Sequence, residues 1–266
     1  MKVLIISGSH PRHLYLLQDI VKRGYDCSAI IMEREGLLPE PPKSIGGKEK
    51  NLFLDHFSDR YEIENKAYGN LTEAVFGDIN KYYCSPKDLN SENTASFVKQ
   101  VKADFAIIFG PDLIKNPVFD LLPKEKLNVH LGLSPWYRGS ATLFWPFYFL
   151  EPQYAGATFH NITKEADAGG ILHQVVPVLE KGDGIHDVGV KTVIAARIAL
   201  KELLKKREKE GYWNFKEQKQ SGKLFLTSDF QPCHLKVIYS LFQNKIVDRY
   251  LDGEFSKKYP KIITGI

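Results

Sequence analysis

The chain has 266 residues, 43% of them hydrophobic, so it can bury a full core as one large domain or one domain with a small addition. Its 36 basic and 32 acidic residues give a net charge of +4 with no block of like charge, which argues against tight binding of nucleic acid by a basic face. Three widely spaced cysteines argue against a disulfide framework or a zinc site, and indicate a reducing, cytoplasmic location.

The start of the chain is typical of a buried strand. The segment "VLIIS" at 3–7 is a continuous apolar run that ends at Gly8, and it does not have the features of a signal peptide. A helix is predicted over 13–24 and a second strand over 27–32. Strand, helix and strand of these lengths form a βαβ unit, which predicts a parallel sheet.

The middle of the chain continues this alternation after an irregular loop rich in proline and glycine at 33–47. The residue patterns predict a charged helix at 48–69 and a second helix at 94–103. They then predict a strand at 104–110, a short helical connection at 111–123 and a further strand at 126–133. The apolar stretch at 141–150 contains a proline and is too short to cross a bilayer, so no membrane partner is expected.

The second half predicts two paired strands at 155–162 and 170–179, then a strong helix at 188–210. These elements indicate an α/β fold with a Rossmann-like, mostly parallel sheet and helices on both faces. We expect a catalytic domain over residues 1–210 and a small C-terminal α/β appendage over 211–266.

The strand in "NVHLGLSPWYRG", residues 128–139, carries polar side chains on one face. Because alternate side chains of a strand point the same way, Asn128, His130 and Gly132 share a face opposite the apolar residues of the segment. Ligands of open parallel sheets bind beyond the carboxyl ends of the strands. By itself, however, this pattern is more typical of a half-solvated strand with a partly buried histidine than of a functional site.

A second segment, "ATFHNITKEADAGGILHQ" at 157–174, places His160 on a strand and Asp167 in a loop that ends in two glycines. By itself, Asp-Ala-Gly-Gly is a turn that any hairpin could use, because aspartate and glycine tolerate turn conformations.

Together the two segments resemble the folate-dependent formyltransferases, which include glycinamide ribonucleotide, methionyl-tRNA and sugar-nucleotide N-formyltransferases. The first hallmark of that family is an Asn-x-His strand followed by a Leu-Leu-Pro-type loop that ends in glycine, as in Asn128-Val129-His130 and the loop to Gly139. The second is a histidine on the next strand, an Asp-x-Gly loop and a strand that ends in glutamine. His160, Asp167-Ala168-Gly169 and Gln174 match it.

The resemblance covers most of residues 1–180 and is weakest over 33–90. It departs from the family at Ser134, where leucine is usual, and at Gly132, where a serine or similar small residue is frequent. Neither change affects the Asn128, His130 and Asp167 set.

The resemblance implies that Asn128, His130 and Asp167 are catalytic. An amine would attack the formyl carbon of 10-formyltetrahydrofolate through a tetrahedral oxyanion, to which Asn128 and protonated His130 donate. One such donor lowers the barrier by about 3–4 kcal/mol. Asp167 would raise the pKa of His130, accept a proton through water, or both, and either residue could deprotonate the amine. Direct transfer without an acyl-enzyme is expected.

For the folate, the resemblance implies the turn after the 104–110 strand together with the loop that leads to Asp167. The residues concerned are Phe109, Gly110, Asp112, Leu113, Ile114, Ile162 and Thr163. For Asp112, a plain strand-to-helix turn remains an open alternative.

The acceptor would use the first turn, which lacks the GxGxxG pattern of a nicotinamide dinucleotide site. Gly8, Ser9 and His10, with Arg12, suit a phosphate at a helix N-terminus, as in the glycinamide relatives, although Pro11 removes one amide donor. A turn with charged surface residues is the alternative. Aromatic and basic side chains at Trp136, Tyr137 and Arg138 could also contact the acceptor.

The favoured acceptor is a nucleotide-linked amino sugar. The short, mildly basic C-terminal segment argues against the tRNA enzymes, and the presence of such a segment argues against the glycinamide enzymes. The resemblance then also implies a homodimer and a role in lipopolysaccharide O-antigen biosynthesis. A hydrolase of 10-formyltetrahydrofolate and a non-enzymatic folate- or nucleotide-binding module are alternatives. A metal site of His130, His160, His173 and Asp167 has no recognised ligand spacing and is not expected.

Overall fold

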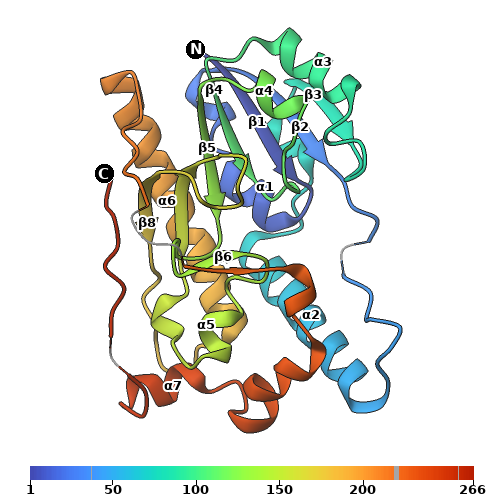
Figure 1. Ribbon diagram of the computed structural model, residues 1–266, viewed down its shortest axis with the longest axis vertical. Coiled ribbons are helices and arrows are strands. Elements are labelled where there is room, and N and C mark those ends of the chain that lie inside the picture. Colours follow the sequence, from blue (N-terminus) through green and yellow to red (C-terminus); the bar gives the residue numbers. More distant parts are fainter. Residues whose placement is uncertain (37, 219–221, 257) are drawn as a thin grey trace.

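The computed structural model describes residues 1–36, 38–218, 222–256 and 258–266. A seven-stranded sheet in the order β3-β2-β1-β4-β5-β7-β8 forms its centre (Figure 1). The strands are β1 (Lys2–Gly8), β2 (Asp26–Met32), β3 (Asn80–Cys84), β4 (Phe105–Phe109), β5 (Glu125–His130), β7 (Ala157–Asn161) and β8 (Ile171–Val175). The first five are parallel, whereas β7 runs antiparallel to β5 and β8. The predicted α/β fold with a mostly parallel sheet is confirmed.

Helices cover both faces of this sheet. The helices α1 (Pro11–Leu17) and α6 (Ile185–Glu210) pack on one face, where Val3 and Ile5 of β1 are buried. The helices α3 (Glu92–Val101) and α4 (Val118–Leu121) pack on the other, over Leu4 and Ile6. This two-sided burial is the reason that the first strand is a continuous apolar run instead of an alternating one.

A third apolar core lies below the sheet in Figure 1, among α2 (Gly47–Tyr68), α5 (Trp145–Tyr148) and α7 (Ile246–Leu251). There β6 (Tyr137–Gly139) pairs in parallel with β9 (Lys223–Phe225). The aromatic stretch at 141–150 supplies Phe144, Trp145 and Phe147 to this core. The proposed appendage of residues 211–266 therefore shares a core with the segments before it.

The remaining helical segments are single turns. They comprise 3-10 turns at Val21–Arg23, Glu73–Phe76, Pro152–Tyr154, Thr227–Asp229 and Pro232–His234, and a π-helical turn at Val237–Leu241. The end of the chain runs beside β8, where the Gln174 N–H donates to the Ile263 carbonyl at 2.8 Å.

Three of the differences between the structure and the predicted elements have a local physical reason. Strand β3 was not predicted, because among its five residues only Cys84 is buried and the apolar pattern is weak. The helix expected over 13–24 ends at Leu17, and a separate 3-10 turn precedes the left-handed Gly24. Helix α6 begins at Ile185, three residues early, where the Asp187 carboxylate accepts from the Gly184 N–H at 2.9 Å.

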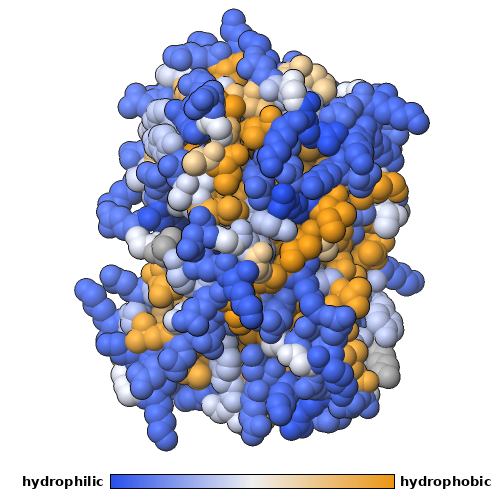
Figure 2. Space-filling view, turned by 180° about the vertical axis from the view of Figure 1, so that it is seen from behind, coloured by the Kyte–Doolittle hydropathy of each residue, from blue (hydrophilic) through white to orange (hydrophobic). Residues whose placement is uncertain are grey.

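Viewed from behind, the surface is mostly hydrophilic; an oblique apolar band runs from the centre toward the right, and smaller apolar patches lie apart from it (Figure 2). Within the described ranges, no helix is both long enough and apolar enough to span a bilayer.

Candidate functional site

Strands β5 and β7 bring the two sequence motifs together. Their antiparallel register sets Asn128 directly opposite His160, and His130 opposite Thr158. Residues opposite each other in such a pair lie on the same face. Leu127 and Val129 are buried in the core on the other face, as strand alternation predicts. One face of β5 and β7 is thus reserved for polar side chains.

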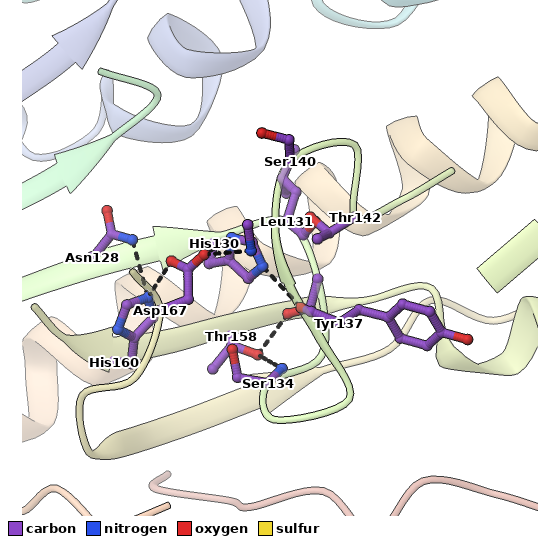
Figure 3. Close-up of polar contacts among 12 residues, drawn as sticks. Asn128, His130, Leu131, Ser134, Tyr137, Ser140, Thr142, Thr158, His160 and Asp167 are labelled. Atoms are coloured by element: carbon purple, nitrogen blue, oxygen red, sulfur yellow. Dashed lines mark hydrogen bonds and ion pairs between the residues drawn. The ribbon is translucent and has the colours of Figure 1, made fainter. Parts of the chain in front are cut away.

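Asp167 joins this polar face from the loop between β7 and β8. Its Oδ1 lies 3.3 Å from His160 Nε2, and its Oδ2 lies 3.4 Å from His130 Nδ1. Asn128 Nδ2 in turn lies 3.0 Å from His160 Nε2. The four side chains form a continuous series in the order Asn128, His160, Asp167, His130 (Figure 3).

Backbone contacts hold Asp167 in place. The Gly139 N–H donates to Asp167 Oδ2 at 2.9 Å, and the Gln218 side-chain amide donates to the Asp167 carbonyl at 2.9 Å. Asp167 itself has a φ of 48°, in the left-handed region that aspartate tolerates better than most residues. The loop is therefore tied to β6 and to the segment after α6.

The glycine of the Asp-x-Gly motif has a steric role. A Cβ at Gly169 would lie 1.7 Å from the Asn161 carbonyl oxygen, so any side chain must push the loop away from β7. We expect Gly169→Ala to lower the free energy of unfolding by about 1–3 kcal/mol and to reduce activity, because the displaced loop carries Asp167.

Chemical denaturation and an activity assay of the purified variant measure both effects. Gly46→Ala is the matched control for activity, because a Cβ at Gly46 meets no atom within 4 Å; since Gly46 is the N-cap of α2, it is not a control for stability. Wild-type stability and activity in Gly169→Ala would contradict this role.

The protonation state of His130 differs from the expected one. Burial lowers the pKa of His130, and the opposing effect of the Asp167 carboxylate does not overcome it. The sequence-based expectation of a raised pKa considered only the carboxylate and omitted desolvation. His130 is therefore neutral in the resting protein at pH 7.

Both ring nitrogens of His130 nevertheless face oxygen atoms. Nε2 lies 3.0 Å from the Tyr137 carbonyl, closer than Nδ1 lies to Asp167 Oδ2. A neutral imidazole has a single N–H, which the shorter contact assigns to Nε2. Nδ1 is then unprotonated beside a carboxylate, a position in which it can take up a proton.

Asp167 is ionised. Burial by itself would raise the pKa of Asp167, but His130, His160 and the Gly139 N–H together lower it well below its usual range. An ionised carboxylate between two imidazoles stabilises positive charge on either of them, and it is itself a weak base.

A cavity of about 400 Å³ opens beside these side chains. Its walls are the turn after β4, the end of β5 and the loop before Asp167. All seven residues that the sequence suggests for the folate line it: Phe109, Gly110, Asp112, Leu113, Ile114, Ile162 and Thr163. The Asp112 carboxylate is paired with Arg34. The cavity lies at carboxyl ends of sheet strands, where open α/β sheets bind ligands.

The residues suggested for the acceptor are placed differently. Gly8, Ser9, His10, Arg12, Trp136, Tyr137 and Arg138 are all described, and none is among the residues that line this cavity. Arg12 is paired with Glu64 at 3.1 Å. The guanidinium of Arg138 donates to the Gly222 carbonyl at 3.3 Å.

The two aromatic residues of that set pack into the third core. The Tyr137 ring stacks on Phe225 and points away from the polar series, so only the Tyr137 carbonyl reaches His130 (Figure 3). Trp136 packs edge-on against Tyr154. The positions of these two rings are thus determined by their burial in the apolar core, and not by their proximity in sequence to the Asn-x-His motif.

His160 is not among the candidate catalytic residues predicted from the sequence, although it belongs to the second motif. Only the strand register shows that His160 contacts both Asn128 and Asp167. Thr142 and Glu165 also line the cavity, and neither has a sequence signal.

Gln174, the glutamine of the second motif, has a structural role. Its side-chain amide donates to the Ser134 carbonyl at 2.6 Å and to Thr158 Oγ1 at 3.2 Å, which fixes the loop after His130.

In the described part of the chain, no three His, Cys, Asp or Glu side chains are grouped as metal ligands. His173 lies opposite Phe159, on the face away from His160.

Solved structures share this fold at low sequence identity. An N-formyltransferase from Helicobacter canadensis, in complex with folinic acid and dTDP-3-aminofucose, is 18% identical, with 87% of this chain and 72% of that chain covered and a TM-score of 0.56. A sugar N-formyltransferase from a Shewanella species is 15% identical, with coverages of 91% and 88% and a TM-score of 0.57. Phosphoribosylglycinamide formyltransferase from Anaplasma phagocytophilum is 17% identical, with coverages of 85% and 98% and a TM-score of 0.54.

The sequence itself matches a family. Residues 57–203, more than half of the chain, match the formyl transferase family. This range contains both motifs and all four side chains of the polar series. The chain belongs to the formyl transferase family.

Proposed function

We propose that the protein transfers the formyl group of 10-formyltetrahydrofolate directly to the amine of a nucleotide-linked amino sugar. The observation that carries this proposal is the series of Asn128, His160, Asp167 and His130 on the wall of a cavity of about 400 Å³. The similar fold of an N-formyltransferase with folinic acid and a dTDP-linked amino sugar supports this substrate pair.

Asn128 is the proposed donor to the formyl oxygen. Its Nδ2 carries two hydrogens, and the contact with His160 Nε2 at 3.0 Å uses one of them. His160 Nδ1 lies 2.8 Å from the Asn161 carbonyl, which can accept its N–H. The second Asn128 hydrogen is then free to stabilise the oxyanion of the tetrahedral intermediate.

His130 is the proposed acceptor of the amine proton. Its neutral Nδ1 lies beside an ionised carboxylate, so protonation there creates an ion pair with Asp167 at 3.4 Å. Asp167 is the weaker candidate, because its lowered pKa makes protonation unfavourable. The cavity-lining turn at 109–114 and the loop at 162–163 would hold the folate.

The direct test incubates the purified protein with 10-formyltetrahydrofolate and a panel of nucleotide-linked amino sugars. Mass spectrometry should detect one N-formylated product together with tetrahydrofolate. Tetrahydrofolate that appears without an acceptor would instead indicate the hydrolase. If neither product forms and folate binding is absent by calorimetry, the proposal fails.

The pH profile tests the role of His130. We expect kcat/KM to be level near pH 7 and to fall about tenfold per pH unit once the pH is below the His130 pKa, which lies under its ordinary value of 6.5. In Asp167→Asn the carboxylate that raises this pKa is lost. The acid limb should then move to lower pH while the plateau rate drops. A limb that moves to higher pH would exclude His130 as the base.

We also propose a cytoplasmic location and a homodimer. The location is inferred from the three cysteines, Cys27, Cys84 and Cys233, which are few and widely spaced in the sequence. Analytical ultracentrifugation of the purified chain measures the oligomeric state.

A further inference from the structure

A second cavity, of about 290 Å³, adjoins the first. It is lined by α1, α2, α6 and the loop after β5, and it shares Leu131 and Thr142 with the folate cavity. Leu131 directly follows His130 in the chain. A molecule in the second cavity would therefore lie next to the residue that follows His130.

The second cavity holds one more positive than negative charge. Of its two arginines, Arg12 is paired with Glu64 at 3.1 Å. Arg60 has no carboxylate within salt-bridge distance in the described ranges, and its guanidinium lies over the Phe57 ring at 4.6 Å. Burial, and then repulsion by Arg12, lowers the pKa of Arg60 to about 9, so the side chain is still a cation at pH 7.

The other polar groups of this region do not neutralise that charge. His56 Nδ1 lies 2.7 Å from the Tyr239 hydroxyl, which lies 3.2 Å from His186 Nε2. Burial lowers the pKa of His56 to about 2 and that of His186 to about 3, so both rings are neutral. They offer hydrogen bonds without charge, while Phe144 and Phe230 supply apolar walls.

The wall that α6 contributes is unusually open. Gly189 lies inside this helix and lines the second cavity, and a Cβ there would meet only Leu143, at 3.8 Å. Packing therefore does not require a glycine, although glycine within a helix is less stable than alanine. Its effect is to leave the wall of the cavity free of a side chain.

We propose that the second cavity binds the phosphate-bearing part of the amine acceptor, with Arg60 as the residue that binds the phosphate. This inference rests on the proposed function and adds the position and chemical class of the acceptor. A buried guanidinium that has no carboxylate partner favours binding of a phosphate, because it can donate two parallel N–H bonds to two oxygens of one phosphate group. A cavity of 290 Å³ is at the small end for ligand sites, so it suits the phosphate and the group next to it.

Calorimetry with inorganic pyrophosphate, with dTDP and with folinic acid tests the proposal on the full chain. The variants are Arg60→Gln, Gly189→Leu and the matched control Arg249→Gln, whose guanidinium pairs with Glu254 at the surface. We expect the wild-type and control proteins to bind pyrophosphate or dTDP, and Arg60→Gln to bind at least tenfold more weakly. Gly189→Leu, which fills the cavity, should also lose binding. Folinic acid affinity should be unchanged in all variants.

Each opposite result overturns the inference. The inference fails if neither pyrophosphate nor dTDP binds the wild-type protein. It also fails if both bind Arg60→Gln as tightly as they bind the wild-type protein. Weaker folinic acid binding by Arg60→Gln, with pyrophosphate binding unchanged, would assign Arg60 to a carboxylate of the folate. Preferential binding of dTDP over pyrophosphate indicates a nucleotide acceptor, and the reverse indicates a simple phosphate ester. Because these readouts do not need turnover, anion binding without formyl transfer would refute the proposed function alone.

Discussion

Replacement of Asn128 by alanine is expected to lower kcat for formyl transfer by about 10²–10³-fold, while the fold and folate binding are retained. Removal of one preorganised donor to an oxyanion costs about 3–4 kcal/mol of transition-state stabilisation. Asn128 lies on a strand whose other face packs in the core, so truncation of its side chain leaves Leu127 and Val129 in place. Single-turnover kinetics with the purified variant measure the effect.

Asn51→Ala, at an exposed position of α2, is the matched control and should keep wild-type kcat. Asp167→Ala should also lose transfer, because the His130 imidazolium would lack its counter-ion. Circular dichroism and thermal unfolding verify the fold of each variant. Full activity in Asn128→Ala or in Asp167→Ala would remove the proposed mechanism.

Acidification from pH 7 to pH 5 is expected to remove roughly 6 kcal/mol of folding stability. The pKa of His10 is lowered to about 4, that of His56 to about 2 and that of His186 to about 3, in each case chiefly by burial. Between these values and 6.5 the unfolded chain binds protons that the folded chain refuses. The contribution of these neutral histidines to the free energy of unfolding is therefore fully present above pH 6.5 and is lost as the pH falls. At pH 5 the loss is about 2 kcal/mol for each histidine.

This loss is comparable with the total stability of an ordinary domain, about 5–15 kcal/mol, so the protein should unfold in mild acid. Urea denaturation at a series of pH values measures the slope. In His10→Asn one titrating group is removed and the N-cap of α1 receives a favourable residue, so the loss should be about 2 kcal/mol smaller. A stability that is constant from pH 7 to pH 5 would show that the buried histidines accept protons in the folded state.

The polar site was predictable in part because its residues follow local patterns. The Asn128 and His130 alternation on one strand, and the Asp167-Ala168-Gly169 turn, are both visible in the sequence. The seven residues suggested for the folate also meet at one cavity, since they belong to a turn and a loop at the same edge of the sheet. Strand and turn patterns are short-range, so one chain contains enough information to place them.

Other parts of the site depend on contacts between distant segments. The contact between Asn128 and His160 requires the register of β5 and β7, and the burial of His130 reverses the pKa shift expected from its neighbour. The Tyr137 ring lies in the core because β9 pairs with its strand, with Lys223, 86 residues later in the sequence, as the register partner of Tyr137. Neither register nor desolvation can be read from a local pattern.

The sequence by itself determined the α/β class, the faces of the buried strands and the three side chains of the motifs. These features follow from apolar periodicity and from residue types that one reaction needs at fixed spacing. Only the tertiary structure decided which side chains share a cavity: Arg60 of α2 and Gly189 of α6 meet beside Leu131 because three separate elements pack there. Cavities form where packing leaves space between elements, and that space depends on the whole fold.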